Sequence, residues 1–330
     1  MIQIQYNKHF SEERIPQVSV ITSVYNRREI LLRAMRSVAA QSFTDIEYIV
    51  VNNGSTMMID DVVEGFMEEA TIPVVYIKRE SGIGPHTGKN SAFRQARGKY
   101  LVMLDSDDEL LPHAVERLYQ AWLSLPEGER GAYREVVARC INEHGEEIGA
   151  EFPDWLNCCS KKEAFKAWHS PELAVEHVEM NLTQPLKELM FPEPEGVTWV
   201  VDSVVLWDRL SKKYRSHFIN DCLKRYYVGS AASISNTQIN KVSLQHCINM
   251  LWASKFMLEH WSEYDYTLKD RIKQIGRYAI WKRALQKHDA YPAYAWAQEG
   301  LKGAVNQLLY LLLYLPSCVA VNKYIKNKMQ

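Results

Sequence analysis

The sequence predicts an α/β protein with a mostly parallel sheet, flanked by helices, in the manner of a Rossmann-like domain. Two observations support this fold class. Short runs of β-branched and apolar residues alternate with segments of helical periodicity over the first third of the chain. Polar residues follow three of these runs, at residues 22–26, 52–56 and 105–108, where the carboxyl ends of parallel strands would bring them to one edge.

The first four elements alternate strand and helix. Residues 18–25 (VSVITSVY) are apolar on both parities, which suits a strand buried on both faces. Residues 28–41 place Ile30, Leu31, Ala34 and Val38 on one helical stripe. Residues 46–55 read as a second strand that runs into an Asn-Gly turn, and residues 59–70 as a helix with acidic residues in its first turn.

The next four elements repeat the pattern. Residues 72–80 (IPVVYIKRE) indicate a third strand, and residues 86–98 a helix that stops at Gly98. Residues 99–104 (KYLVML) indicate a fourth strand. Residues 111–125 then predict a helix with Pro112 near its start.

The regular alternation is lost after residue 126. Residues 131–153 resemble a hairpin with His144-Gly145 in its turn, a helix is expected from Asp202, and residues 215–229 read as a strand. From about residue 240 the chain is helical and rich in tryptophan and tyrosine. We therefore expect an α/β domain over residues 1–235 and a helical region over residues 236–330, which could associate with a membrane.

The composition is that of a soluble globular protein. The chain has 330 residues, of which 47% are hydrophobic and 24% charged, and a formal net charge of −1. This balance gives no overall attraction to nucleic acid. The six scattered cysteines form no CxxC pair and indicate reduced thiols in the cytoplasm. Neither a signal peptide nor an apolar run of membrane-spanning length is recognisable.

An apolar segment near the C-terminus has two interpretations. Residues 308–321 (LLYLLLYLPSCVAV) are interrupted by Pro316 and would reach only about 21 Å as a helix, short of a bilayer core. They form either a helix that packs on the protein or an anchor at the inner face of the cell membrane. In the second case Lys323, Lys326 and Lys328 would meet lipid phosphates.

Three carboxylates follow the fourth predicted strand. Asp105, Asp107 and Asp108 occupy four positions, and like charges so close repel one another. A divalent cation such as Mg²⁺ or Mn²⁺ would offset this repulsion and could bridge a diphosphate. The alternative is a solvated acidic turn in which Asp108 or Glu109 caps the following helix. The position at the carboxyl edge of the sheet favours the cation.

The chain resembles the family 2 glycosyltransferases, inverting enzymes of the fold called GT-A. The resemblance covers residues 16–125 well, through VSVITSVYNRREILLRAMRSVAAQSFTDIEYIVVNNGST and GIGPHTGKNSAFRQARGKYLVMLDSDDELLP. It covers residues 190–230 weakly, through TWVVDSVVLWDRLSKKY. This family transfers a sugar from a nucleotide-sugar donor to an acceptor hydroxyl.

The resemblance assigns roles to residues at the predicted sheet edge. It implies that Asp107 ligates the metal and that Asp105 contacts ribose or metal. The family usually has an acidic residue near Asn53 that contacts the base, typically uracil, and here the amide of Asn53 would take that role. The other implied nucleotide contacts lie in the loops and the third helix, and they are Thr22, Tyr25, Asn26, Gly82, Gly84, Lys89 and Asn90.

Structural roles compete with several of these assignments. The two glycines could simply shape a loop, Lys89 could be a solvated helix residue, and Tyr25 could serve packing. Lysine at position 89, where the family commonly has arginine, is a point charge without a bidentate fork.

A carboxylate should act as the catalytic base that removes the proton of the acceptor hydroxyl. The family places this base at the start of a helix, just ahead of an aromatic-containing run such as LWLRL, and LWDRL at residues 206–210 fits that run. Asp202 is the first candidate, Glu195 the second and Glu193 the third, and the alternative for Asp202 is a helix cap.

The sequence thus predicts a non-processive, metal-dependent transferase with a UDP-linked donor. Its expected acceptor is a glycan or a lipid-linked glycan in cell-surface polysaccharide synthesis. The processive Gln-x-x-Arg-Trp signature is absent. A nucleotidyltransferase on a similar sheet and a non-catalytic nucleotide-sugar-binding module are the alternatives, and the segment TSVYNRRE lacks the glycines that a nucleotidyltransferase tends to carry.

Overall fold

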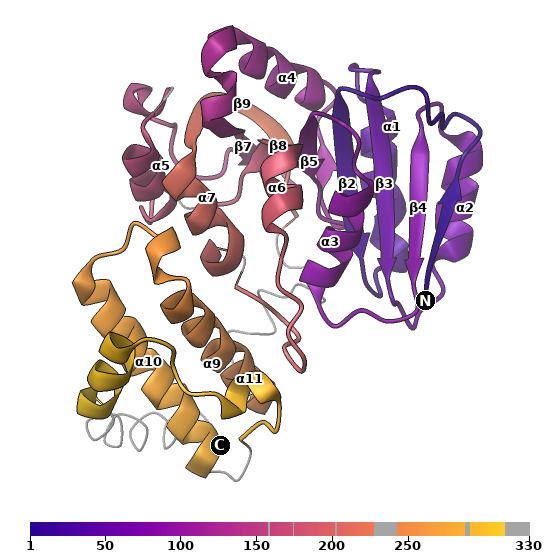
Figure 1. The fold of residues 1–330 in the computed structure, drawn as a ribbon. Helices are drawn as coiled ribbons and strands as arrows, with labels where there is room; N and C mark the ends of the chain where they lie inside the picture. The colour runs from indigo at the N-terminus through magenta and orange to yellow at the C-terminus, as the bar shows by residue number, and fades with distance from the viewer. Residues whose placement is uncertain (158, 174, 202, 228–242, 288–290, 314–330) are drawn as a thin grey trace. The chain divides into compact units, whose positions relative to one another are not determined.

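The computed structural model describes residues 1–157, 159–173, 175–201, 203–227, 243–287 and 291–313 (Figure 1). These residues pack into two compact units. The first unit consists of the described residues within 1–190 and 210–230, and the second of the described residues within 191–209 and 231–330.

The first unit is built on one mixed sheet, which has nine strands in the described residues, in the order β1-β4-β3-β2-β5-β8-β7-β9-β6. The central strands β4, β3, β2 and β5 run parallel. Strand β1 pairs antiparallel with β4 at one edge, and β8 pairs antiparallel with both β5 and β7. The strands are β1 (Ile2–Tyr6), β2 (Val18–Val24), β3 (Ile46–Asn53), β4 (Val74–Arg79), β5 (Tyr100–Met103), β6 (Glu109–Leu110), β7 (Tyr133–Ile141), β8 (Val178–Leu182) and β9 (Arg215–Arg225).

Helices cover both faces of this sheet. Alternate side chains of β2, β3 and β4 face α1, α2 and α4 and form the main hydrophobic core, in which Trp122 and Tyr48 are fully buried. Figure 1 shows α3 on the opposite face from α1 and α2. The helices are α1 (Arg28–Ala39), α2 (Asp60–Glu69), α3 (Pro85–Gln95), α4 (Ala114–Ser124), α5 (Lys161–Trp168) and α6 (Thr183–Leu189).

The second unit is helical in its described residues. Helices α9 (Leu244–Glu259) and α10 (Leu268–Lys287) pack against each other through a core that includes Leu251, Ile275 and Tyr278. A short helix α11 (Ala295–Gln298) and a helical segment over residues 304–313 complete this unit. The π-helical turn Ser203–Trp207 leads into α7 (Asp208–Lys213).

The structure confirms the predicted α/β class and each strand and helix predicted before residue 126, with ends shifted by a few residues. It also confirms the strand β9 and the helical C-terminal region. The expected hairpin over residues 131–153 forms only in part. β7 pairs with β8 and β9, and only a single bridge, Ile141–Glu147, closes the turn at Gly145.

The sequence prediction did not include the strands β1, β6 and β8 or the helices α5 and α6. Within the described residues, no helix combines the length and apolar character needed to cross a membrane. The second half of the apolar segment 308–321 and all three lysines after it lie outside the described residues.

Candidate active site

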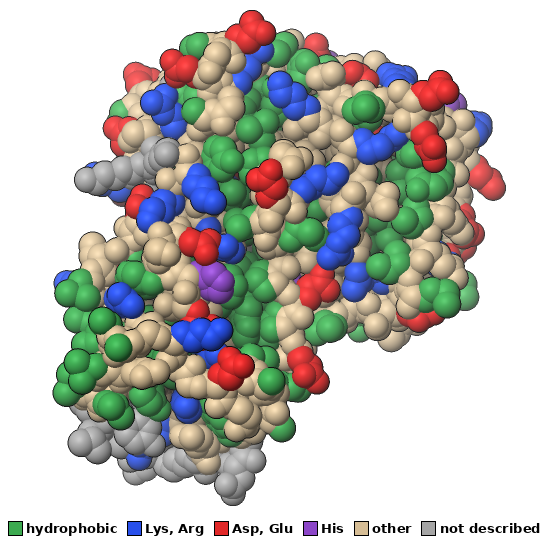
Figure 2. Space-filling view, in the orientation of Figure 1, with side chains coloured by type: hydrophobic (Ala, Val, Ile, Leu, Met, Phe, Trp, Pro, Cys, Tyr) green, Lys and Arg blue, Asp and Glu red, His purple; other side chains and the backbone are tan. Residues whose placement is uncertain are grey.

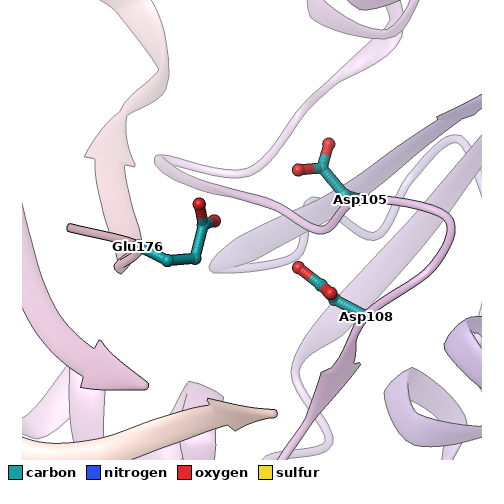
Figure 3. Close-up of side chains that lie close together, drawn as sticks. All are labelled: Asp105, Asp108 and Glu176. Carbon is teal, nitrogen blue, oxygen red and sulfur yellow. The ribbon is translucent and has the colours of Figure 1, made fainter. Parts of the chain in front are cut away.

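Three carboxylates converge where β5 ends. Asp105 follows β5, Asp108 precedes β6, and Glu176 lies two residues before β8. One oxygen from each lies within 4.8 Å of the others, and Figure 3 shows the three side chains turned toward a common space. The antiparallel pairing of β8 with β5, in which Met180 faces Val102, explains why residues so distant in sequence meet here.

Asp108 is the buried member of this group, which we call the acidic cluster (Asp105, Asp108 and Glu176). The backbone N–H of Tyr227 donates to its carboxylate over 3.2 Å. The ammonium of Lys224 lies 3.2 Å from the other carboxylate oxygen. Burial raises the pKa of Asp108 to about 7, with Lys224 acting in the opposite direction and Asp105 adding to the rise.

The donor set of the acidic cluster fits a hard divalent cation. All three groups are carboxylates, and Asp105 is exposed while Asp108 is buried. Mg²⁺ and Mn²⁺ prefer such oxygen ligands and commonly leave positions open for water or phosphate oxygens. The arrangement can therefore hold a cation with one side toward solvent, where a diphosphate could reach it.

Asp107, predicted as a metal ligand, has another partner in this structure. Its carboxylate forms an ion pair of 2.6 Å with Arg27, and both side chains are about 15% exposed. The guanidinium of Arg33 donates to the backbone carbonyl of Asp107. The structure brings Asp105 together with Asp108 and Glu176, and a metal-binding role for Asp107 stays a prediction.

The loop after β2 is fixed to the loop after β3. Asn26 adopts the left-handed conformation, with φ of 53°. Its side-chain oxygen accepts from the backbone N–H groups of Thr56 and Met57 over 2.9 and 3.0 Å. Thr22 is buried and accepts from the Tyr48 hydroxyl over 2.9 Å, whereas Tyr25 is 53% exposed at the loop. Tyr25 is thus the member of the predicted nucleotide contacts in this loop whose ring faces solvent.

The amide of Asn53 is engaged inside the protein. Its nitrogen donates to the carbonyl of Gly84 over 2.9 Å, and its oxygen accepts from the Thr87 hydroxyl over 3.0 Å. A Cβ on Gly82 would lie 2.2 Å from the Asn53 carbonyl oxygen. The loop at residues 81–84 therefore packs directly on the end of β3, and Gly82 is needed for this contact whether or not it also approaches a ligand.

The start of α3 lies equally close to β2. A Cβ on Gly88 would lie 2.0 Å from the hydroxyl of Ser23, so Gly88 is a close-contact glycine that the sequence did not single out. Lys89 is half-buried and Asn90 is buried on the same helix. Their predicted contacts with ribose or phosphate stay predictions.

A further carboxylate lies at this edge of the sheet. Asp60, at the start of α2, forms an ion pair of 2.6 Å with Lys78 and accepts from the Tyr76 hydroxyl over 2.5 Å. The amide nitrogen of Asn52 lies 3.4 Å from the same carboxylate. Burial works against ionisation, but Lys78 and Tyr76 together hold the pKa of Asp60 below its usual value. Asp60 thus places a negative charge beside Asn52, where the resemblance led us to expect an acid.

The candidates for the catalytic base belong to the second unit. Asp202 lies outside the described residues. Glu195 and Glu193 are exposed, and the backbone carbonyl of Glu195 accepts from the Trp296 indole N–H over 2.9 Å. The assignment of the base therefore stays a prediction.

Sequence comparison identifies the region that carries this sheet edge. Residues 19–137 match the family model described as glycosyl transferase family 2. Over this segment the chain is similar to glycosyl transferase family 2. Among family relatives, it is 31% identical over 138 residues to a GalNAc(5)-diNAcBac-PP-undecaprenol beta-1,3-glucosyltransferase of Campylobacter jejuni, which covers 42% of each chain. It is 36% identical over 105 residues to a chondroitin synthase of Escherichia coli, which covers 32% of this chain and 15% of that protein.

These alignments leave more than half of each family 2 relative unmatched. Among solved structures, S. aureus TarS (residues 1–349) superimposes with a TM-score of 0.53 at 15% identity, covering 95% of this chain and 83% of that one. TarS in complex with UDP-GlcNAc gives the same TM-score at 16% identity, covering 94% and 92%. At such low identity these likenesses concern the fold, and they agree with the GT-A-type architecture predicted from the sequence.

Proposed function

We propose that this protein is an inverting, metal-dependent, non-processive glycosyltransferase. It moves one sugar at a time from a nucleotide-sugar donor to a hydroxyl of a glycan or lipid-linked acceptor. The observation that carries the proposal is the acidic cluster at the carboxyl edge of the sheet. Asp105 and Asp108 lie within residues 19–137, which match family 2, and Glu176 lies after that segment in the sequence. Family 2 relatives named as a glucosyltransferase and as chondroitin synthase support the reaction class and a role in glycan synthesis.

In this mechanism the acidic cluster would hold Mg²⁺ or Mn²⁺. The cation, when bound, would supply positive charge that stabilises the departing nucleoside diphosphate. The acceptor hydroxyl oxygen would attack the anomeric carbon of the donor sugar. Asp202, or failing it Glu195, would take the proton of that hydroxyl. Attack from the face opposite the leaving diphosphate inverts the configuration at that carbon.

A UDP-linked donor is the first choice. TarS, which shares the fold, was crystallised with UDP-GlcNAc. Tyr25, with its ring exposed beside the β2 loop, is a candidate for stacking on the base. The Asn53 amide already forms hydrogen bonds with Gly84 and Thr87 and so stabilises the loop at residues 81–84. A contact with the base would have to use the remaining donor and acceptor capacity of this amide.

A lipid-linked acceptor would place the protein at the inner face of the cell membrane. The Campylobacter relative is named for an undecaprenol-linked substrate. In the second unit, four large apolar side chains of the segment 304–313 are 53–69% exposed, and they are Val305, Leu308, Leu311 and Leu312. Figure 2 shows hydrophobic side chains on the surface of this unit, at the lower left. Deletion of residues 304–330 should reduce sedimentation with anionic vesicles, and unchanged sedimentation would exclude this anchor.

A screen of nucleotide sugars for release of nucleoside diphosphate tests the proposed reaction. We expect release with one donor in the presence of Mn²⁺, none with EDTA, and a loss of at least 100-fold on Asp202→Asn. The variants Asp105→Asn and Asp107→Asn test the two predicted metal ligands one at a time. If the protein binds a donor but releases no nucleoside diphosphate with any acceptor, the non-catalytic module is favoured instead.

A further inference from the structure

Lys224, on β9, lies inside the acidic cluster. Its ammonium is 2.5 Å from a Glu176 oxygen and 3.2 Å from an Asp108 oxygen, and its side chain is only 4% exposed. Strand pairing explains this position, because Lys224 lies opposite Leu110 of β6, two residues after Asp108. A lysine from the far half of the sheet thus contacts two of the three carboxylates that could ligate a cation.

The charge of Lys224 is maintained by these neighbours. Burial alone would disfavour the ammonium, but its ion pairs with Glu176 and Asp108 stabilise it. A permanent positive charge therefore stands next to the oxygens that a divalent cation would use. The Lys224 ammonium and a divalent cation bound to the same carboxylates would repel each other strongly in a poorly solvated site.

We propose that Lys224 is a built-in counter-ion that competes with the divalent cation for Asp108 and Glu176, and thereby sets the affinity of the site for metal. This inference rests on the proposed function, because it concerns the same site. It explains how Asp108 can be buried beside two other carboxylates before any metal binds. A bound cation would have to take oxygens of Asp108 and Glu176 from the lysine.

The test compares Lys224→Met with a matched control in the other unit. Lys255 on α9 is as buried, at 5% exposure, and also pairs with two carboxylates, those of Glu259 at 3.1 Å and Glu299 at 3.6 Å. Mn²⁺ dissociation constants are measured by calorimetry on the full chain, and melting temperatures are measured in EDTA and in Mn²⁺. Lys224→Gln, which keeps hydrogen-bond donors but no charge, provides a second variant if the Met variant does not fold.

We expect both Lys224 variants to melt below the wild type in EDTA, to bind Mn²⁺ about tenfold more tightly or better, and to gain more stability from Mn²⁺. Lys255→Met should melt lower with unchanged Mn²⁺ affinity. Equal or weaker Mn²⁺ binding by the Lys224 variants, or no binding by any protein, would overturn the inference. Release of nucleoside diphosphate is measured separately, so that a failure of the proposed function is recognised independently.

Discussion

Glu179 on β8 should make the stability of the first unit depend on pH. Its side chain is mostly buried, and it lies close to Glu135 and Glu176, with Arg134 and Lys224 opposing them. Burial, reinforced by Glu135, raises the pKa of Glu179 to about 7. The perturbation we consider is Glu179→Gln, which has the shape of the protonated acid and cannot ionise.

The sign and size of the effect follow from this pKa. Between the ordinary value of 4.5 and about 7 the folded protein keeps a proton that the unfolded chain has released. The free energy of unfolding of the wild type therefore falls as pH rises through this window, by up to 1.36 kcal/mol per pH unit and by about 3 kcal/mol in all. The Gln variant lacks this loss.

Urea unfolding of both proteins at pH 5, 6, 7 and 8 measures the effect. The stability of the Gln variant relative to the wild type should grow by about 3 kcal/mol from pH 5 to pH 8. Because burial is the main cause, the trend should persist in 1 M salt, which screens exposed charges. A difference that does not change with pH would refute this account of Glu179.

Two further predictions concern the packing of the first unit. Gly82→Ala should destabilise the protein by about 1–3 kcal/mol and weaken donor binding, because the new Cβ would overlap a β3 carbonyl, whereas Gly65→Ala in the open interior of α2 should be neutral or stabilising. Glu47→Ala should cost about 3–5 kcal/mol, because the fully buried carboxylate accepts two hydrogen bonds from Arg97, at 2.7 and 2.8 Å. Its control Glu69→Ala, in an exposed ion pair, should cost less than about 1 kcal/mol. Urea unfolding measures each change, and a reversed order within either pair would contradict it.

The central part of the fold could be predicted from the sequence because its strands are buried on both faces. Residues 18–25 and the stretch 48–51 (YIVV) carry apolar residues on both parities, as strands buried on both faces do. Strand β1 was missed because its residues are largely exposed at a sheet edge and carry no such run. Strand β8 was missed because its sequence VEMNL mixes apolar and polar residues, and its Glu179 lies in a buried region with other charged groups.

The sequence could predict only the part of the site whose residues are close together in the chain. The sequence placed Asp105 and Asp108 at the carboxyl edge because they directly follow a predicted strand. Glu176 and Lys224 lie 68 and 116 residues after Asp108, and only the pairing of β8 with β5 and of β9 with β6 brings them there. The sequence carries no clear signal for Lys224, because the β9 residues before it, INDCL, mix polar and apolar side chains.

The most direct measurement is the thermal shift caused by UDP with Mn²⁺ and with EDTA, in the wild type and in Asp105→Asn. Asp105 is exposed, so this substitution should leave the fold intact. The account predicts that UDP raises the melting temperature of the wild type only with Mn²⁺, and that Asp105→Asn loses this dependence. Equal stabilisation by UDP in EDTA, or a full Mn²⁺-dependent shift in Asp105→Asn, would contradict the claim that the acidic cluster holds the cation that binds the donor diphosphate.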